Sequence, residues 1–239
     1  MVLEVRDLTL VISDKPDPER DAVAAVWEAA GGEVLRLGRF WEPPPLDPDR
    51  VRVYGADAFC QVLAQKLALA LVTPADDLLL HLSPGVVKRA VRAAKVSEVD
   101  SIVFPAFVKS YIPKLIRSRV YASQSDLIGE LRGLEPTTEL LVSEIVELEA
   151  EARSWVLDGE VVSIACYEGD ADLGPAGALA SAAARESVVP SPCVIDVGLT
   201  RDRGWIVIEA NAAWGAGLNG CDALAAARCI ARATHAADT

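Results

Sequence analysis

Two stretches near the C-terminal end of the chain decide the fold, Val194-Ile-Asp-Val-Gly-Leu199 and Trp205-Ile-Val-Ile-Glu-Ala-Asn211. Both are rich in β-branched and other apolar residues, which is typical of strands. The polar segment Thr200-Arg-Asp-Arg-Gly204 separates them and has the length of a turn. The sequence therefore predicts an antiparallel β-hairpin at this place.

The predicted hairpin carries three side chains with oxygen donors, Asp196, Glu209 and Asn211. Glu209 and Asn211 are two residues apart, so they point to the same side of their strand, and Asp196 on the paired strand can converge with them. Carboxylate and amide oxygens suit Mg²⁺. Strands with one solvated polar face show the same alternation, so the hairpin by itself fits either a metal site or a polar surface.

Segments upstream extend the pattern, and together they resemble the ATP-grasp superfamily. Asp196, Glu209 and Asn211 match its metal-binding acid, acid and Asn in order and spacing. The stretch Ala106-Phe-Val-Lys-Ser110 resembles the strand whose Lys contacts nucleotide phosphates, and Leu140-Leu-Val-Ser-Glu-Ile-Val-Glu147 resembles the interdomain hinge. The match runs from about residue 84 to residue 222 and is most similar to a compact clade named for two arginines and one lysine. It implies an ATP-grasp fold with ATP and Mg²⁺ as cofactors.

The resemblance assigns phosphate contacts to three basic residues, Arg89, Lys109 and Lys114. Lys109 ends an apolar strand, where a mobile ammonium group can act as a point charge on phosphate. Arg89 lies in the stretch from Pro84 to Lys95, whose apolar stripe and basic remainder predict an amphipathic helix. Arg89 also fits a simple solvated position on that helix, and the two interpretations stay open here.

The hinge, with Glu144, Ile145, Val146 and Glu147, is the segment that the resemblance assigns to adenine. Backbone groups of such a segment can bind the edge of a planar base while its side chains form the slot. Glu151 matches the acid that holds the ribose hydroxyls. Because these acids belong to one acidic run, which also fits a solvated face, the sequence leaves open which of them contacts the nucleotide.

Arg153 matches the Arg of the compact clade that follows the hinge, so the resemblance implies a contact with the γ-phosphate or an acyl phosphate. Val194 stands where many amino-acid ligases have an Arg, two residues before the first metal-binding acid. Arg153 or Arg203 would then have to replace it. The Gly-rich segment 215–220 is expected either to bring backbone amides to a substrate or to connect flexibly to the last helix.

The resemblance implies an ATP-dependent carboxylate–amine ligase with Lys109 and Arg153 as catalytic residues. A small-molecule or peptide carboxylate would attack the γ-phosphorus of ATP, and an amine would displace phosphate from the resulting acyl phosphate. Two other functions remain open: an ATP-binding regulatory or scaffold module without efficient ligation, and phosphoryl transfer to an acceptor without amide formation.

The amino-acid composition of the chain argues against several classes of function. The net charge of −12 argues against a nucleic-acid partner, which would need a basic surface. Five Cys without a CxxC pair and two His argue against a disulfide framework, a zinc site and a Ser-His-Asp triad. The start Met1-Val-Leu-Glu-Val-Arg6 lacks the features of a secretory signal. The longest apolar helix that the sequence predicts, Ala56 to Val72, contains polar residues and is a poor membrane span. We expect a cytoplasmic protein that does not enter a membrane.

The first eighty residues alternate strand and helix, with strands expected at Leu8–Ile12, Glu33–Leu37 and Val51–Tyr54. This alternation predicts a small parallel α/β layer, similar to the domain that precedes many ATP-grasp folds. We place the domain boundary after residue 73, which gives an N-terminal α/β domain (1–73) and an α+β ATP-grasp region (74–239).

Within the second region, a strand is expected at Ile102–Val108 and a helix at Asp222–Ala236. The pair Asp158-Gly159 between two apolar runs predicts a tight hairpin turn.

Overall fold

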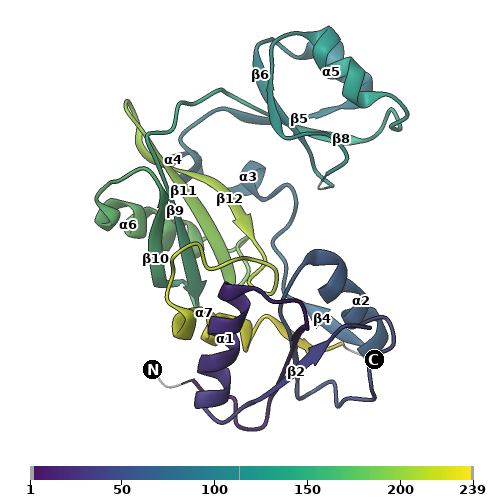
Figure 1. Ribbon diagram of the computed structural model, residues 1–239. Coiled ribbons are helices and arrows are strands. Elements are labelled where there is room, and N and C mark those ends of the chain that lie inside the picture. Colours follow the sequence, from purple (N-terminus) through teal and green to yellow (C-terminus); the bar gives the residue numbers. More distant parts are fainter. Residues whose placement is uncertain (1–2, 113, 238–239) are drawn as a thin grey trace.

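The structure, a computed structural model, describes residues 3–112 and 114–237. Figure 1 shows three tiers, with the N-terminal α/β layer at the bottom, a four-stranded sheet carrying α6 in the middle, and a second four-stranded sheet carrying α5 at the top.

The bottom tier is a parallel sheet in the order β2-β1-β3, flanked by helices. Its elements are β1 (Thr9–Ser13), α1 (Pro18–Ala29), β2 (Glu33–Leu37), β3 (Val51–Val53), α2 (Asp57–Leu67) and β4 (Leu69–Leu71). The Asp17 carboxylate accepts the Arg20 amide at 2.9 Å and so caps α1 in the way expected of Asp before a helix. The predicted parallel α/β layer is confirmed.

The top tier is an antiparallel sheet in the order β5-β8-β6-β7. Its elements are β5 (Val91–Lys95), the 3₁₀ turn η1 (Val96–Ser101), β6 (Ala106–Ser110), β7 (Arg119–Tyr121), α5 (Gln124–Leu131) and β8 (Glu139–Ser143). The short helices α3 (Leu78–His81) and α4 (Pro84–Val87) lead into it from β4.

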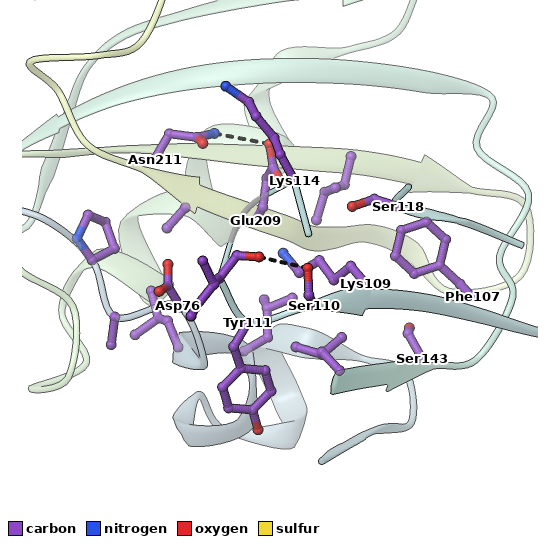
Figure 2. Close-up of a pocket in the computed structure, with 18 of the residues that line it drawn as sticks. Asp76, Phe107, Lys109, Ser110, Tyr111, Lys114, Ser118, Ser143, Glu209 and Asn211 are labelled. Carbon is purple, nitrogen blue, oxygen red and sulfur yellow. Dashed lines mark hydrogen bonds between the residues drawn. The ribbon is translucent and has the colours of Figure 1, made fainter. Parts of the chain in front are cut away.

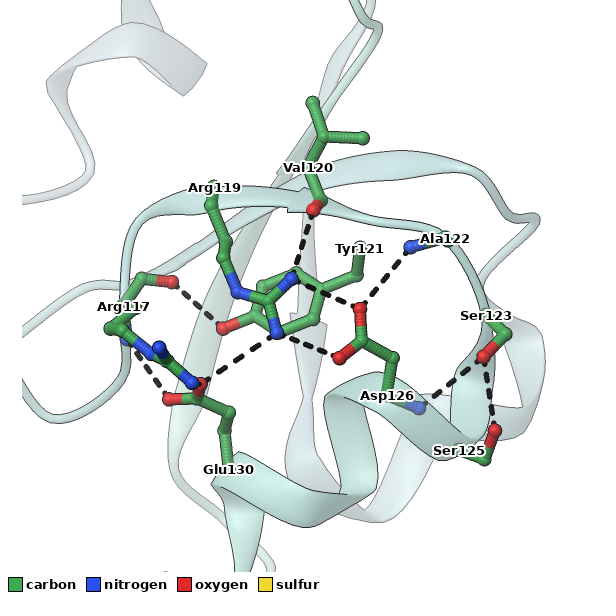
Figure 3. A network of polar contacts seen from close by, with 9 residues as sticks. All are labelled: Arg117, Arg119, Val120, Tyr121, Ala122, Ser123, Ser125, Asp126 and Glu130. Atoms are coloured by element: carbon green, nitrogen blue, oxygen red, sulfur yellow. Dashed lines mark hydrogen bonds and ion pairs between the residues drawn. The ribbon is translucent and has the colours of Figure 1, made fainter.

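An ion-pair network fastens β7 to α5 in this tier (Figure 3). The Arg119 guanidinium donates to both carboxylate oxygens of Asp126, at 3.0 and 2.7 Å, and lies over the Tyr121 ring at 4.1 Å. Arg117 pairs with Glu130 on the next turn of α5. The network therefore holds Arg117 and Arg119, where the loop after β6 ends and β7 begins, against α5.

The middle tier is an antiparallel sheet in the order β10-β9-β11-β12. Its elements are β9 (Ala150–Leu157), β10 (Glu160–Glu168), α6 (Leu173–Ala184), β11 (Cys193–Thr200) and β12 (Gly204–Asn211). The predicted β11–β12 hairpin is confirmed, as is the Asp158-Gly159 turn between β9 and β10. The small residues of α6 let this helix pack closely on one face of the sheet, and they share a hydrophobic cluster with Ile195, Val197 and Trp205 of that sheet.

The chain ends by returning to the bottom tier. Helix α7 (Ala223–Ile230) packs beside α1, and β13 (Thr234–Ala236) pairs antiparallel with β4. The prediction of one helix over Asp222–Ala236 is therefore wrong in its second half. The Ala-rich composition favours helix, but pairing with the open edge of β4 outweighs that local preference.

The predicted amphipathic helix from Pro84 to Lys95 is also wrong. Helix α4 ends after one turn because Lys88 takes a left-handed conformation, with φ of 53°, and Val91–Lys95 then joins the sheet as β5. The apolar helix expected over Ala56–Val72 is shorter, because Ala68 at φ 53° ends α2 and β4 follows. The strand expected at Ile102–Val108 begins only at Ala106, after the 3₁₀ turn.

Within residues 3–112 and 114–237 the buried apolar side chains form three clusters, and the largest joins the N-terminal and C-terminal parts of the chain. In this cluster Leu10 and Leu63 of the bottom tier pack with Trp155 of β9 and Ile230 of α7. The bottom tier thus completes its core with residues from the C-terminal part of the chain. The boundary after residue 73 stays a prediction.

This shared core predicts a selective loss of stability for Ile230→Ala. Ile230 is fully buried in it, so truncation should lower the free energy of unfolding by about 2–5 kcal/mol. The matched control is Leu224→Ala on the same helix, which is 46% exposed and should change stability by less than about 0.5 kcal/mol. Urea unfolding followed by circular dichroism measures both, and equal small effects would contradict the shared core.

Candidate functional site

A cavity of about 800 Å³ lies between the top and middle sheets (Figure 2). Its walls come from β6 and the loop after it, the hinge after β8, β12 and the loop after it, and the linker after β4. The lining residues with polar or aromatic side chains include Asp76, Arg89, Phe107, Lys109, Lys114, Glu144, Glu209, Asn211 and Trp214.

A β-bulge in β12 aims two of the predicted metal ligands into this cavity. Asp196 pairs with Glu209 but the next residue, Val197, pairs with Val207, so Ile208 is an extra residue in β12. Simple alternation from Val207 would have put Glu209 on the α6 face, where Val207 is buried. The bulge shifts the alternation by one residue, and Glu209 and Asn211 therefore line the cavity.

The three predicted metal ligands share one hydrogen-bond network. The Asn211 amide nitrogen donates to Asp196 Oδ2 and to Glu209 Oε1, both at 3.1 Å. Residues 3–112 and 114–237 contain no group of three or more His, Cys, Asp or Glu placed to hold a metal ion. The candidate set is instead two carboxylates completed by an amide. These hard oxygen donors converge, so they fit Mg²⁺.

Arg153 holds Asp196 from the neighbouring strand. The two residues are directly paired across β9 and β11, and the Arg153 guanidinium donates to Asp196 Oδ1 at 2.9 Å and to Oδ2 at 2.7 Å. Burial is the largest single influence and works to lower the pKa of Arg153, but hydrogen bonding to Asp196 together with the negative charge around the guanidinium outweighs burial, and the pKa is raised. Asp196 is only 2% exposed and lies behind Glu209 and Asn211, so neither Asp196 nor Arg153 lines the cavity.

The two predicted phosphate-contacting lysines lie on the opposite wall. Lys109 is half-buried on β6, close enough to Asp76 to lower the pKa of that carboxyl, although burial raises it more strongly. Lys114 is largely exposed, and its Nζ lies 3.8 Å from an Asp57 oxygen. Ser110 donates to the Ile112 carbonyl at 2.7 Å and so shapes the turn after β6.

The hinge residues Glu144, Ile145 and Val146 line the cavity, whereas Glu147 is exposed and lies outside it. Glu144 accepts from the Ala90 amide at 3.2 Å and from Arg203 Nη1 at 2.9 Å, with a second contact to Arg203 Nη2. Bonding to Arg203, helped by the Ala90 amide, lowers the pKa of Glu144 from 4.5 to about 2. The Glu144 side chain therefore fastens the hinge to the β11–β12 turn.

Glu151 and Arg89 have protein partners as well. Tyr167 donates to Glu151 Oε2 at 2.6 Å, and Glu151 lies outside the residues that line the cavity. Arg89 does line it, but from the segment between α4 and β5 rather than from a helix. Its Nε donates to Ser143 Oγ at 3.0 Å and its Nη2 to the Ile208 carbonyl at 3.1 Å, while Nη1 donates to the Val207 carbonyl.

The Gly-rich segment after β12 is tied down rather than open. Glu19 of α1 accepts the amides of Leu218 and Asn219, both at 2.8 Å, and Arg153 donates to the Gly217 carbonyl at 3.1 Å. A Cβ at Gly217 would lie 2.6 Å from a Glu19 oxygen, which explains Gly at this position. Of the two alternatives for this segment, a flexible connection does not fit these contacts, and two of the amides that could face a substrate already have Glu19 as an internal partner.

Sequence reasoning missed several cavity residues. Asp76 belongs to the linker after β4, while Phe107 and Leu148 read as ordinary apolar residues beside predicted site segments. Phe107 lies two residues before Lys109 on β6, so the two side chains share one face of the strand. The alternation of the strand could therefore have placed Phe107 at the site. No local signal marked Asp76, because its position depends on how the linker passes the two sheets.

Comparison with protein families matches residues 87–229 to the ATP-grasp domain, family 2 of the clade named for two arginines and one lysine. The chain belongs to this family, and with it to the ATP-binding, ligase-type ATP-grasp proteins. The resemblance inferred from the hairpin, the strand Lys and the hinge is thereby confirmed.

Solved structures confirm the fold. The RimK domain ATP-grasp protein from Sphaerobacter thermophilus is 18% identical, with a TM-score of 0.64 over 94% of this chain and 98% of that chain. D-cycloserine synthetase DcsG is 17% identical, with a TM-score of 0.62 over the same shares. N5-carboxyaminoimidazole synthase from Aspergillus clavatus is 12% identical, with a TM-score of 0.59 over 95% of this chain and 77% of that chain.

A search of curated proteins gave no significant match. None of the helices within residues 3–112 and 114–237 combines the length and the apolar character needed to cross a membrane.

The contacts of Glu144 predict a pH-dependent contribution to stability. Because the pKa of Glu144 is lowered to about 2 in the folded protein, its ion pair stabilises the fold above pH 4.5 and is lost as the pH falls towards 2. Glu144→Gln should therefore be less stable than the wild type at neutral pH, and the difference should shrink between pH 4.5 and 2. Urea midpoints across this range measure it. The control is Glu147→Gln in the exposed part of the hinge, and a Glu144→Gln difference that does not change with pH would contradict the assignment.

Proposed function

We propose that this protein is an ATP-dependent carboxylate–amine ligase that works through an acyl phosphate. One observation carries the proposal: Lys109 from the top sheet and Glu209 with Asn211 from the middle sheet line the same cavity. A cation on one wall and hard oxygen donors on the other are what a triphosphate with Mg²⁺ requires.

In this proposal the adenine lies at the hinge. The backbone of Glu144, Ile145 and Val146 supplies hydrogen-bonding groups, and Leu148 with Ile208 supplies an apolar wall of the same cavity. A planar base fits such a slot because its faces are apolar and its edge is polar. The triphosphate then extends towards Lys109 and the end of β12.

The metal ligands, Lys109 and Arg153 have separate roles in the proposed reaction. Glu209 and Asn211 line the cavity and would hold Mg²⁺, with Asp196 behind them as the third predicted ligand, and the ion would supply positive charge to phosphate oxygens. Lys109 offsets further negative charge on the transferring phosphoryl group. Burial raises the pKa of Asp196, and the hydrogen bonds from Arg153 oppose that rise and orient the carboxylate. The proposed contact of Arg153 with the γ-phosphate or acyl phosphate would require a shift away from that carboxylate.

The proposed reaction has two transfers. A carboxylate oxygen bonds to the γ-phosphorus while the bond to the β,γ-bridging oxygen breaks, which releases ADP. The nitrogen of the amine then attacks the acyl carbon, phosphate leaves, and the nitrogen loses a proton.

The relatives support a ligase of this kind. One is named a D-cycloserine synthetase, and the N5-carboxyaminoimidazole synthase was solved with ADP and an aminoimidazole ribonucleotide. We propose a small-molecule or peptide carboxylate and an amine as substrates, in the cytoplasm.

The proposal predicts that Lys109→Met and Glu209→Gln abolish ADP formation. Loss of a charge that acts mainly in the transition state should reduce turnover about a hundredfold or more. The assay supplies hydroxylamine, which traps an acyl phosphate as a hydroxamate, with a panel of carboxylates and Mg·ATP. The control is Glu139→Gln, a change at an exposed carboxylate at the start of β8, which should leave turnover unchanged.

The same assay separates the alternatives. Hydroxamate formed in proportion to ADP supports the ligase. Tight ATP binding without ADP formation would point to a regulatory module, and a phosphorylated acceptor without hydroxamate or amide would point to phosphoryl transfer.

The adenine slot predicts a specific effect of Gly198→Ala. A Cβ at Gly198 would lie 2.7 Å from Leu148 Cδ2 and 3.0 Å from Ile208 Cδ1, so the ends of these two cavity-lining side chains would have to shift. Overpacking of about 1–3 kcal/mol should weaken ATP binding about tenfold, measured by calorimetry. The control is Gly177→Ala on α6, where an added Cβ has nothing within 4 Å. Unchanged ATP affinity of Gly198→Ala would contradict the slot.

A further inference from the structure

We propose that Arg89 is a positioning residue for the metal-binding end of the cavity: its guanidinium holds the β12 bulge that turns Glu209 and Asn211 towards the cavity. This inference rests on the proposed function, since it concerns the same Mg²⁺ site. It assigns to Arg89 a task different from a direct phosphate contact.

The bulge creates a need for hydrogen-bond donors. An extra residue interrupts the ladder between β11 and β12, and a buried carbonyl left without a partner costs free energy. The carbonyls of Val207 and Ile208, at the bulge itself, accept from Arg89 Nη1 and Nη2. One guanidinium thus serves two successive carbonyls.

Only an arginine suits this arrangement. Its planar fork presents donors in fixed directions, whereas a lysine ammonium is a single point that cannot span both carbonyls and a third acceptor. The third acceptor is Ser143 Oγ, 3.0 Å from Arg89 Nε, and the Ser143 hydroxyl donates in turn to the Glu144 carbonyl at 3.0 Å. Arg89 therefore connects the hinge to the bulge through all three of its nitrogens.

Losing the bulge would misplace the metal ligands. With regular alternation, Glu209 would share a face with Val207 and Trp205, which are buried against α6. A carboxylate there would be buried without a cation. The bulge, and with it the hydrogen bonds from Arg89, decides which face of β12 carries the carboxylate and the amide.

The test uses Tb³⁺ luminescence in the full-length protein without nucleotide. Tb³⁺ is a hard cation like Mg²⁺, no phosphate is present to contact Arg89, and Mg²⁺ competition shows that the same site is measured. Arg89→Lys and Arg89→Met should both weaken Tb³⁺ binding by about tenfold or more, and amide hydrogen exchange across residues 205–211 should accelerate. The matched control pair is Arg92→Lys and Arg92→Met, at an exposed residue of β5, which should leave both readouts unchanged.

Unchanged Tb³⁺ affinity in both Arg89 variants would overturn the proposal, whatever happens to ATP binding. Ser143→Ala serves as a milder variant that keeps the Arg89 charge and removes one anchor. It should weaken Tb³⁺ binding by a few-fold, and an unaltered affinity there would also count against the proposal if the Arg89 variants fail to fold. Excess Mg²⁺ should restore ATP turnover to Arg89→Lys, which a general folding defect would not allow.

Glu209→Gln separates this inference from the proposed function. If Glu209→Gln keeps full Tb³⁺ affinity, the metal site itself is wrong and both proposals fail. If Glu209→Gln loses Tb³⁺ binding while Arg89→Lys and Arg89→Met keep it, only the positioning role of Arg89 fails.

Discussion

A single extra residue in β12 is the constraint on which the site depends. The middle sheet packs one face against α6 in the hydrophobic core and presents the other face to a polar cavity. Ile208 is the extra residue that lets β12 contribute to both faces. Before the bulge, Trp205 and Val207 alternate into the core. After it, Glu209 and Asn211 face the cavity. The bulge thus gives one strand a structural half and a functional half.

A continuous chain of polar contacts runs from that strand to the bottom tier. Asn211 joins the two carboxylates, Arg153 holds Asp196, and the same guanidinium donates to the Gly217 carbonyl. Glu19 of α1 then holds the amides that follow Gly217. The N-terminal layer is therefore more than a neighbour of the cavity, because it fixes the loop that Arg153 contacts. The Glu144–Arg203 pair has the corresponding role at the hinge end.

Short sequence patterns predicted the structural features that depend on residues close together in the chain. Alternation and the polar turn were enough for the β11–β12 hairpin, and the spacing of Glu209 and Asn211 placed them together. Local patterns failed where distant segments decide. The stripe of Val87 and Val91 fits a helix, but Val91–Lys95 pairs with the edge of β8 as a strand. The bulge, the Glu144–Arg203 pair and the bonds of Arg89 join segments far apart in the chain, so no window of sequence contains them.

The central claim is that one cavity between the two antiparallel sheets binds ATP with its metal ion. The most direct measurement is a crystal structure with Mg²⁺ and a non-hydrolysable ATP analogue. We predict adenine against the backbone of Glu144–Val146, the triphosphate beside Lys109, and the ion bound by Glu209 and Asn211. Nucleotide bound at another surface, or an ion with no contact to either of these β12 side chains, would contradict that claim.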